Sequence, residues 1–417
     1  IGHMPENGAL ALTGVGVCMP IIMIVSAFAA LVSNGGAPRA SMAMGKGDYD
    51  EAERILSNSF SLQLVISFAL TIVLLLFNRP LLLTFGGSEN TIGYATAYMN
   101  IYAIGTVFVQ LTLGMNAFIT AQGFAKTGML SVLIGAVCNI ILDPIFIYGF
   151  NMGVRGAAVA TVLSQAMSTI WVLRFLTGKN TLIRIRRKYM RMRAKIVVPG
   201  ITLGLAPFIM QASESIIIVC FNASLLKYGG DVAVGAMTIL SSAMQFSMLP
   251  MQGLGQGAQP ISSYNYGTRN AARVKKTFQL LLLSTVIYAV TIWALLMLFP
   301  QWFAMIFAKK TDMELILYTK DALRIYCAAM GIFGIQMACQ FTFISIGNAG
   351  ASIMVAVMRK FVLLLPLIYL MPKIFQENKA QAVYLAEPVA DILAVIFTVI
   401  LFYFQFRRAL RKLEDNN

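Results

Sequence analysis

The 417-residue chain is poor in charge and in metal-binding side chains. Only 12% of its residues are charged, and its single histidine is His3, whereas soluble proteins carry about 25% charged residues. A metal site or dyad built from several histidines is therefore excluded within one chain. Five cysteines lie in apolar runs without metal-like spacing and are expected to be packing residues, not disulfides or ligands. The sequence has no Walker motif and no nucleophile–base motif, so neither direct ATP use, nor an enzyme, nor an organic cofactor is expected.

Apolar sequence is abundant, at 58% of the chain. A bilayer core of roughly 30 Å needs about 20 apolar residues in a helix, and eleven stretches are long enough. We predict spans at about 10–33, 57–77, 94–121, 127–149, 154–176, 199–226, 231–254, 278–299, 322–346, 351–372 and 381–405. The chain is thus predicted to be an all-α, multi-pass membrane protein.

The net charge of +15 is concentrated in the segments between spans, above all in 178–198, which contains many Lys and Arg and no acid. If this linker is cytoplasmic and the sides alternate, most basic residues fall on the cytoplasmic side, as the positive-inside rule requires. The charge then needs no nucleic acid to explain it. We expect the linker and the C-terminus to be cytoplasmic. The linker itself is either a solvated loop or a contact for anionic lipid.

The two halves of the chain repeat each other with a nearly constant shift. At a shift of 222, identical residues include the pairs Ser41/Ser263, Gly45/Gly267 and Pro144/Pro366. We expect two pseudo-symmetric lobes: 1–177 with five spans, the linker 178–198, 199–405 with six spans, and a tail at 406–417. The sixth span has no partner in the first half. We therefore expect that one N-terminal helix is absent and that the natural protein has twelve transmembrane helices.

One span carries a carboxylate, Asp143, and ionisable groups inside membrane helices usually have a function. Asn139 lies four residues earlier, so both share one helix face. Pro144 removes a backbone donor and tends to kink the helix. The corresponding residues of the second half are Phe361 and Leu365, so shared packing does not explain the polar pair. A carboxylate in this setting can take up a proton or bind sodium among oxygen neighbours, and either use remains open.

Four segments resemble the multidrug and toxic compound extrusion (MATE) family, and the chain looks closest to its bacterial branch. They are Ala121-Gln122-Gly123 with 139–147, then 156–165, 256–267 and 385–391. The resemblance implies two helical lobes around a central cavity and a cation-coupled antiporter that exports lipophilic, often cationic drugs across the plasma membrane. It implies H+ or Na+ as the coupling ion at Asp143, Asn139 and Thr161, with Asn116 and Tyr98 as cavity neighbours. We expect a monomer.

A second intramembrane acid is Glu214, with Gln211 on the same helix face. Some family members use an acid in this helix for cation coupling, but pair it with acids in later helices, and here those helices carry none. Glu214 and Gln211 are therefore assigned to the substrate cavity, where Glu214 meets a cationic drug. Glu387 and Asp391, again four apart, are expected to pair with Arg359 or Lys360, because buried charges are usually paired.

Two other functions remain open. A lipid-linked precursor flippase of the same superfamily shares the lobe architecture, but often has a basic central cavity, and here only Arg359 and Lys360 lie plausibly inside. A membrane scaffold that transports nothing gives no account of Asp143 and predicts no ion-dependent flux.

Overall fold

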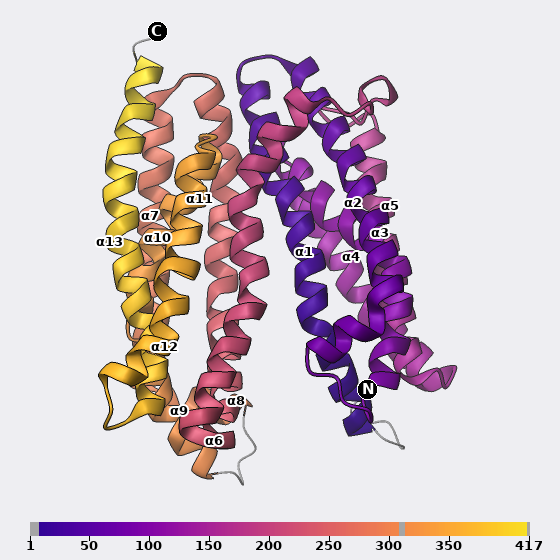
Figure 1. Cartoon of the computed structure of the whole chain (residues 1–417). Helices are drawn as coiled ribbons and strands as arrows, with labels where there is room; N and C mark the ends of the chain where they lie inside the picture. The colour runs from indigo at the N-terminus through magenta and orange to yellow at the C-terminus, as the bar shows by residue number, and fades with distance from the viewer. Residues whose placement is uncertain (1–7, 308–312, 415–417) are drawn as a thin grey trace. The chain divides into compact units, whose positions relative to one another are not determined.

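The computed structural model describes residues 8–307 and 313–414, which form helices and no strand (Figure 1). The all-α prediction is confirmed for this part of the chain. The helices of the first half are α1 (Gly8–Gly45), α2 (Tyr49–Thr84), α3 (Ile92–Ala121), α4 (Ala125–Pro144), the π-helix η1 (Ile145–Gly149), α5 (Gly153–Thr177) and the short 3-10 turn η2 (Arg187–Tyr189). The later ones are α6 (Ala194–Gly267), α7 (Ala271–Leu298), α8 (Pro300–Phe307), α9 (Met313–Tyr326), α10 (Met330–Ser345), α11 (Ala349–Val357), the π-helix η3 (Met358–Leu364), α12 (Leu365–Ile374) and α13 (Lys379–Glu414).

Nine of the described helices are long and apolar enough to cross a membrane, or up to ten if the bent pair α9 and α10 counts as one span. Helix α6 is counted as one of these nine helices, although it has 74 residues. Its backbone breaks at Gly230, whose φ of +67° and ψ of −163° suit a residue without a side chain. The two limbs on either side of Gly230 correspond to the predicted sixth and seventh spans.

The chain divides into two compact units, Ile1–Gln211 and Ala212–Asn417. The division falls inside the first limb of α6, and the predicted lobe boundaries on either side of the basic linker stay a prediction. In unit 1, α3 lies at the centre and packs against α1, α2, α4 and α5. In the most apolar stretch of α3, 61% of the residues are buried, whereas in that of the segment Ala125–Gly149, which contains α4, only 11% are buried. Helix α4, which carries Asp143, is therefore a peripheral helix of its unit.

Unit 2 is built around α10 and α13, which pack against each other. Helix α10 also packs against α7, and α13 packs against α12. One part of its core gathers Phe221, Tyr326 and Tyr384, all buried. Another part is an aromatic stack in which the ring centroids of Phe278 and Phe402 are 4.4 Å apart. Helix α13 follows one face of this core, so its inward side chains are shielded from water.

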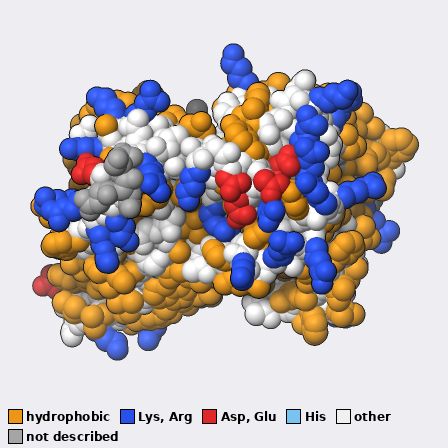
Figure 2. Space-filling model, turned by 90° about the horizontal axis from the view of Figure 1, so that it is seen from above, with side chains coloured by type: hydrophobic (Ala, Val, Ile, Leu, Met, Phe, Trp, Pro, Cys, Tyr) orange, Lys and Arg blue, Asp and Glu red, His pale blue; other side chains and the backbone are white. Residues whose placement is uncertain are grey.

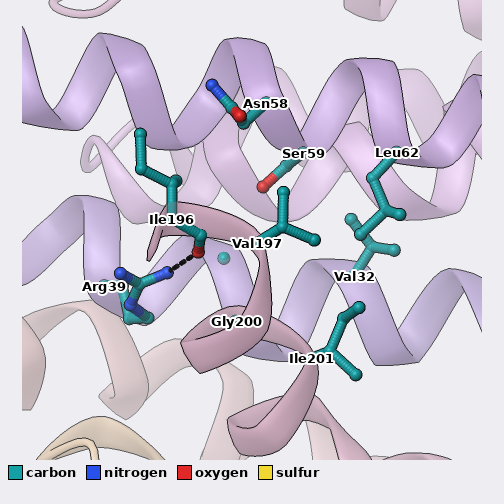
Figure 3. Close-up of a pocket in the computed structure, with 10 residues that line it drawn as sticks. Val32, Arg39, Asn58, Ser59, Leu62, Ile196, Val197, Gly200 and Ile201 are labelled. Atoms are coloured by element: carbon teal, nitrogen blue, oxygen red, sulfur yellow. Dashed lines mark hydrogen bonds between the residues drawn. The ribbon is translucent and has the colours of Figure 1, made fainter. Parts of the chain in front are cut away.

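The start of α6 belongs to unit 1 because it touches α1 backbone to backbone. A Cβ atom on Gly204 would lie 1.7 Å from the carbonyl oxygen of Leu31, and one on Gly35 would lie 1.9 Å from that of Gly200. Arg39 donates from Nη1 to the carbonyl oxygen of Ile196 at 2.6 Å, beside a small pocket (Figure 3). The pocket holds about 10 Å³, which is barely room for one water. It is therefore a packing feature and not a drug site.

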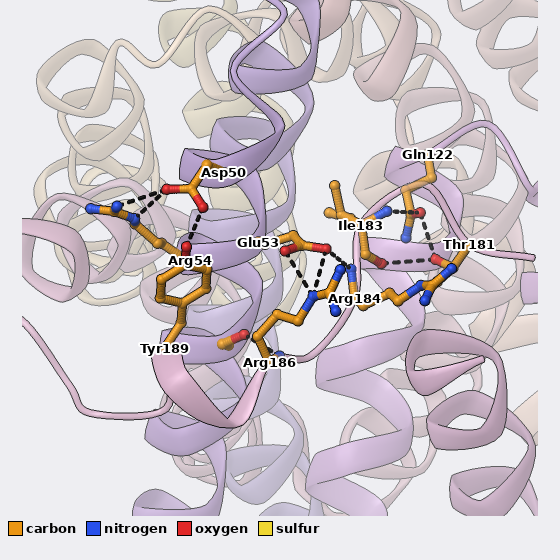
Figure 4. A network of polar contacts seen from close by, with 10 residues as sticks. Asp50, Glu53, Arg54, Gln122, Thr181, Ile183, Arg184, Arg186 and Tyr189 are labelled. Atoms are coloured by element: carbon orange, nitrogen blue, oxygen red, sulfur yellow. Dashed lines mark hydrogen bonds and ion pairs between the residues drawn. The ribbon is translucent and has the colours of Figure 1, made fainter. Parts of the chain in front are cut away.

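The basic linker is bound to unit 1 along its length (Figure 4). The Oε1 atom of Gln122, just after α3, accepts hydrogen bonds from the hydroxyl of Thr181 at 2.7 Å and from the backbone N–H of Ile183 at 3.0 Å. Glu53 on α2 accepts from Nε of Arg186 at 3.0 Å. This hydrogen bond raises the pKa of the Arg186 guanidinium above its ordinary value. The linker is thus ordered, and it packs against the end of α3 and the start of α2.

Candidate functional site

The row of residues that leads to Asp143 packs against α3 and α5. It runs Ser131, Gly135, Asn139, Asp143, at the four-residue spacing that keeps side chains on one helix face. The backbone oxygen of Ser131 accepts from the Ser168 hydroxyl at 2.8 Å, and a Cβ on Gly135 would lie 2.5 Å from that hydroxyl. The close approach of α4 to α5 thus orients the row toward the interior of unit 1.

Asn139 and Asp143 continue this row as a hydrogen-bonded pair. Nδ2 of Asn139 donates to Oδ1 of Asp143 at 3.4 Å, and both side chains are half-buried. The opposite side of α4 is apolar and open, with Ile140 71% exposed. Directly after Pro144 the chain forms η1, and single π-turns of this kind are frequent at functional sites. The geometry leaves a partly accessible carboxylate beside a widened stretch of backbone.

Two more of the predicted residues lie near this pair. Tyr98 of α3 is 7% exposed, and its phenol lies beside the hydroxyl of Thr161 and within electrostatic range of the Asp143 carboxylate. The Thr161 hydroxyl also donates to the backbone oxygen of Ala157 at 2.9 Å. Three helices therefore bring hydroxyl, amide and carboxylate oxygens into one neighbourhood of unit 1.

Asn116, by contrast, is not brought to Asp143. Its Oδ1 accepts from the hydroxyl of Ser131 at 3.1 Å, and Ser131 precedes Asp143 by twelve residues, or about 18 Å of helix. Asn116 and Asp143 therefore lie at different depths along α4. The assignment of Asn116 to a drug cavity stays a prediction that this neighbourhood does not support.

Unit 2 contains a second polar group around Glu214, in the first limb of α6. Nζ of Lys360 donates to Oε2 of Glu214 in an ion pair whose lysine side chain is 4% exposed and whose carboxylate is 48% exposed. Gln211, three residues earlier on the same helix and the last residue of unit 1, is half-buried. Glu214 is therefore accessible, yet it already has a cationic partner.

The expected pairing of Glu387 and Asp391 is confirmed. Arg359 donates from Nη2 to Glu387 at 2.9 Å and from Nε to Asp391 at 2.8 Å, and all three side chains are nearly fully buried. Its guanidinium also lies 4.6 Å from the ring centre of Phe333. Arg359 and Lys360 both lie in the π-helix η3. The sequence left open which of the two cations pairs with Glu387 and Asp391, and it did not connect Lys360 with Glu214.

The remaining candidates for ligands are few. Within 8–307 and 313–414, no three His, Cys, Asp or Glu side chains converge as a metal-binding set. The five cysteines are free, in agreement with their assignment as packing residues.

Comparison with known proteins identifies the fold and the family. The family model MatE matches residues 1–145 and 206–370. The multidrug export protein MepA of Staphylococcus haemolyticus is 28% identical over 280 residues, which are 67% of this chain and 62% of that protein. A solved structure of the MATE multidrug transporter DinF-BH is 34% identical, with a TM-score of 0.86 over 95% of this chain and 88% of that one. A MATE structure in the bent conformation has a TM-score of 0.91 at 22% identity over 98% of this chain and 90% of that one, and shows the fold alone.

Together with the apolar helices, these likenesses define a multi-pass membrane transporter. The chain belongs to the MatE family.

Proposed function

We propose that this protein exports lipophilic, often cationic small molecules from the bacterial cell in exchange for H+ or Na+, by alternating access. The names of its relatives support the cargo, since MepA is a multidrug export protein and DinF-BH a multidrug transporter. Exchange requires that ion and cargo bind the two states of the transporter with different affinities.

Asp143 is the proposed coupling residue, and its half-buried pair with Asn139 is the observation that carries the proposal. Tyr98 and Thr161 supply further oxygens nearby. Oxygen ligands suit hard cations, and a carboxylate with a hydroxyl neighbour can equally hold a proton. A half-buried carboxylate that has no cationic partner gains free energy when a cation binds, as coupling demands.

Glu214 and Gln211 are proposed to contact the cargo, with a weaker case for Asn116. The exposed half of the Glu214 carboxylate is available to a cationic molecule. Lys360 would compete with such a molecule, so Glu214 is expected to set selectivity for cations and not to hold them tightly. Replacing Lys360 with Gln should then increase affinity for cationic cargo relative to neutral cargo.

The orientation is proposed from charge. The linker 178–198 and the α13 end, with Arg407, Arg408 and Arg411, carry unbalanced positive charge, and cytoplasmic placement satisfies the positive-inside rule. Figure 2 looks onto the end that carries the linker, where Lys and Arg side chains outnumber acids. The protein is proposed to work as a monomer in the plasma membrane without any cofactor beyond the coupling ion.

The test is efflux of a fluorescent lipophilic cation from proteoliposomes, with H+ and Na+ gradients imposed separately. We expect one gradient to drive efflux and Asp143→Asn to abolish it while the protein stays folded. Asp321→Asn, which removes an exposed acid on α9, should leave efflux unchanged.

Three outcomes would contradict the proposal. Normal efflux by Asp143→Asn would remove the coupling assignment. Flux under neither gradient would favour a scaffold, and translocation of a lipid-linked precursor instead of the cation would favour a flippase.

A further inference from the structure

The backbone of the linker is held by side chains from α2. Asn58 donates to the carbonyl oxygen of Tyr189 at 2.9 Å, and its Oδ1 accepts from the N–H of Arg193 at 2.8 Å. Ser61 donates to the carbonyl oxygen of Met190 at 2.7 Å. These bonds hold residues 189–193 of the linker against α2. We call residues 182–195 the platform, because their side chains project from an ordered backbone.

The basic side chains of this platform have little acid to pair with. Arg187, Lys188, Arg191, Arg193 and Lys195 are exposed, and the linker itself contains no Asp or Glu. Four acids lie at the start of α2, and two of them already form ion pairs, Asp50 with Arg54 and Glu53 with Arg186. The linker 178–198 contains eight Lys and Arg residues, so the platform carries a net positive charge even with these acids beside it.

Apolar side chains lie among these charges. Leu182 is 54% exposed and Met192 is 45% exposed, although both belong to a charged linker. Exposed apolar residues flanked by Lys and Arg are typical of surfaces that lie at the boundary between lipid headgroups and acyl chains.

The platform lies at the ends of membrane-spanning helices. It is bonded to Gln122, directly after α3, and to Glu53, in the first turns of α2, and α5 ends at Thr177, just before it begins. Three membrane-spanning helices thus end or begin at the linker, which places it where the spans leave the hydrocarbon.

We propose that residues 182–195 form a binding surface for anionic phospholipid headgroups, such as phosphatidylglycerol. The charges attract the headgroup phosphates, while Leu182 and Met192 contact the upper acyl chain. Because the backbone is already ordered, little conformational entropy is lost on binding. Each basic side chain removed should weaken the interaction about fivefold, and salt should weaken it further.

The experiment titrates the purified full chain in neutral detergent with phosphatidylglycerol or phosphatidylcholine, and follows both the thermal unfolding midpoint and the lipids retained in native mass spectra. Phosphatidylglycerol should raise the midpoint more than phosphatidylcholine does, and less so at high salt. The variant with Arg187, Lys188, Arg191, Arg193 and Lys195 all changed to Gln should lose this preference. Its matched control changes five exposed basic residues outside the linker, Arg79, Arg155, Lys227, Lys373 and Lys379, to Gln and should keep it.

Two further variants guard against misfolding. Arg187→Gln with Lys188→Gln alters only the short turn η2 and should lose part of the preference. Changing Arg187, Arg191 and Arg193 to Lys keeps the charge and should retain it. The proposal would be overturned if the variant with five linker substitutions preferred phosphatidylglycerol as strongly as the wild type does. It would also be overturned if phosphatidylcholine stabilised the wild type as much as phosphatidylglycerol does. The same stabilisation by inorganic phosphate would show an anion site without lipid selectivity and would likewise overturn it.

Discussion

Arg359 and Asp391 form an ion pair of 2.8 Å in which the two side chains are only 6% and 2% exposed. The same guanidinium reaches Glu387, so one cation joins two acids from successive turns of α13. Inside a membrane protein, such charges are tolerated because each group satisfies the other. The pair thereby connects η3 to α13 within unit 2.

Breaking this pair should destabilise the protein strongly. Arg359→Gln removes the cation and leaves two buried acids, Glu387 and Asp391, without it, so we expect the free energy of unfolding to fall by about 3–5 kcal/mol. Thermal unfolding in detergent measures the effect. Arg54→Gln removes an exposed pair with Asp50 that solvent screens, so its effect on the free energy of unfolding should be far smaller. Similar losses in both variants would show that burial does not decide the strength of these pairs.

The contact between α1 and the start of α6 should not tolerate a methyl group. Gly204→Ala places a Cβ against the Leu31 carbonyl and should destabilise unit 1 by about 1–3 kcal/mol through overpacking. The control is Gly16→Ala, also in a helix, where no neighbouring atom lies within 4 Å. There the loss of backbone freedom in the unfolded chain should stabilise by up to about 1 kcal/mol. Unfolding midpoints of the two variants should therefore move in opposite directions.

The phenol of Tyr98 is expected to support ion coupling. Tyr98→Phe keeps the buried ring but removes the hydroxyl that lies beside Thr161 and near Asp143. Coupled efflux should fall about fivefold, as for one lost hydrogen bond between neutral groups, while the unfolding midpoint stays close to that of the wild type. Tyr102→Phe, one turn away and stacked on Tyr98 at 6.3 Å, is the control. An unchanged efflux rate for Tyr98→Phe would remove this residue from the site.

Gln122 should control how firmly the linker is held. Its Oε1 accepts hydrogen bonds from Thr181, Leu182 and Ile183, so Gln122→Ala leaves three donors without this partner. Trypsin, which cuts after Lys and Arg, should then cleave the linker about tenfold faster or more, because local opening becomes easier. Gln376→Ala, in an exposed loop, should leave the cleavage rate as it is. Equal cleavage of both variants would mean that other contacts suffice.

The sequence alone determined the features that depend on neighbours along the chain. Runs of apolar residues predicted the helices, because an apolar environment requires every backbone group to bond within its own helix. A four-residue spacing placed Asn139 beside Asp143 and Glu387 beside Asp391, since helix geometry alone sets that distance. The charge of Arg359 and Lys360 predicted that acids would meet them.

Only the tertiary structure decided which distant residues meet. Lys360 pairs with Glu214, 146 positions away, while Arg359, its neighbour in η3, takes both acids of α13. The close approach of Gly200 to Gly35, and the binding of the linker to Gln122 and Asn58, likewise join segments far apart in sequence. Such contacts follow from how whole helices pack, where many weak interactions compete, and no local pattern specifies the outcome.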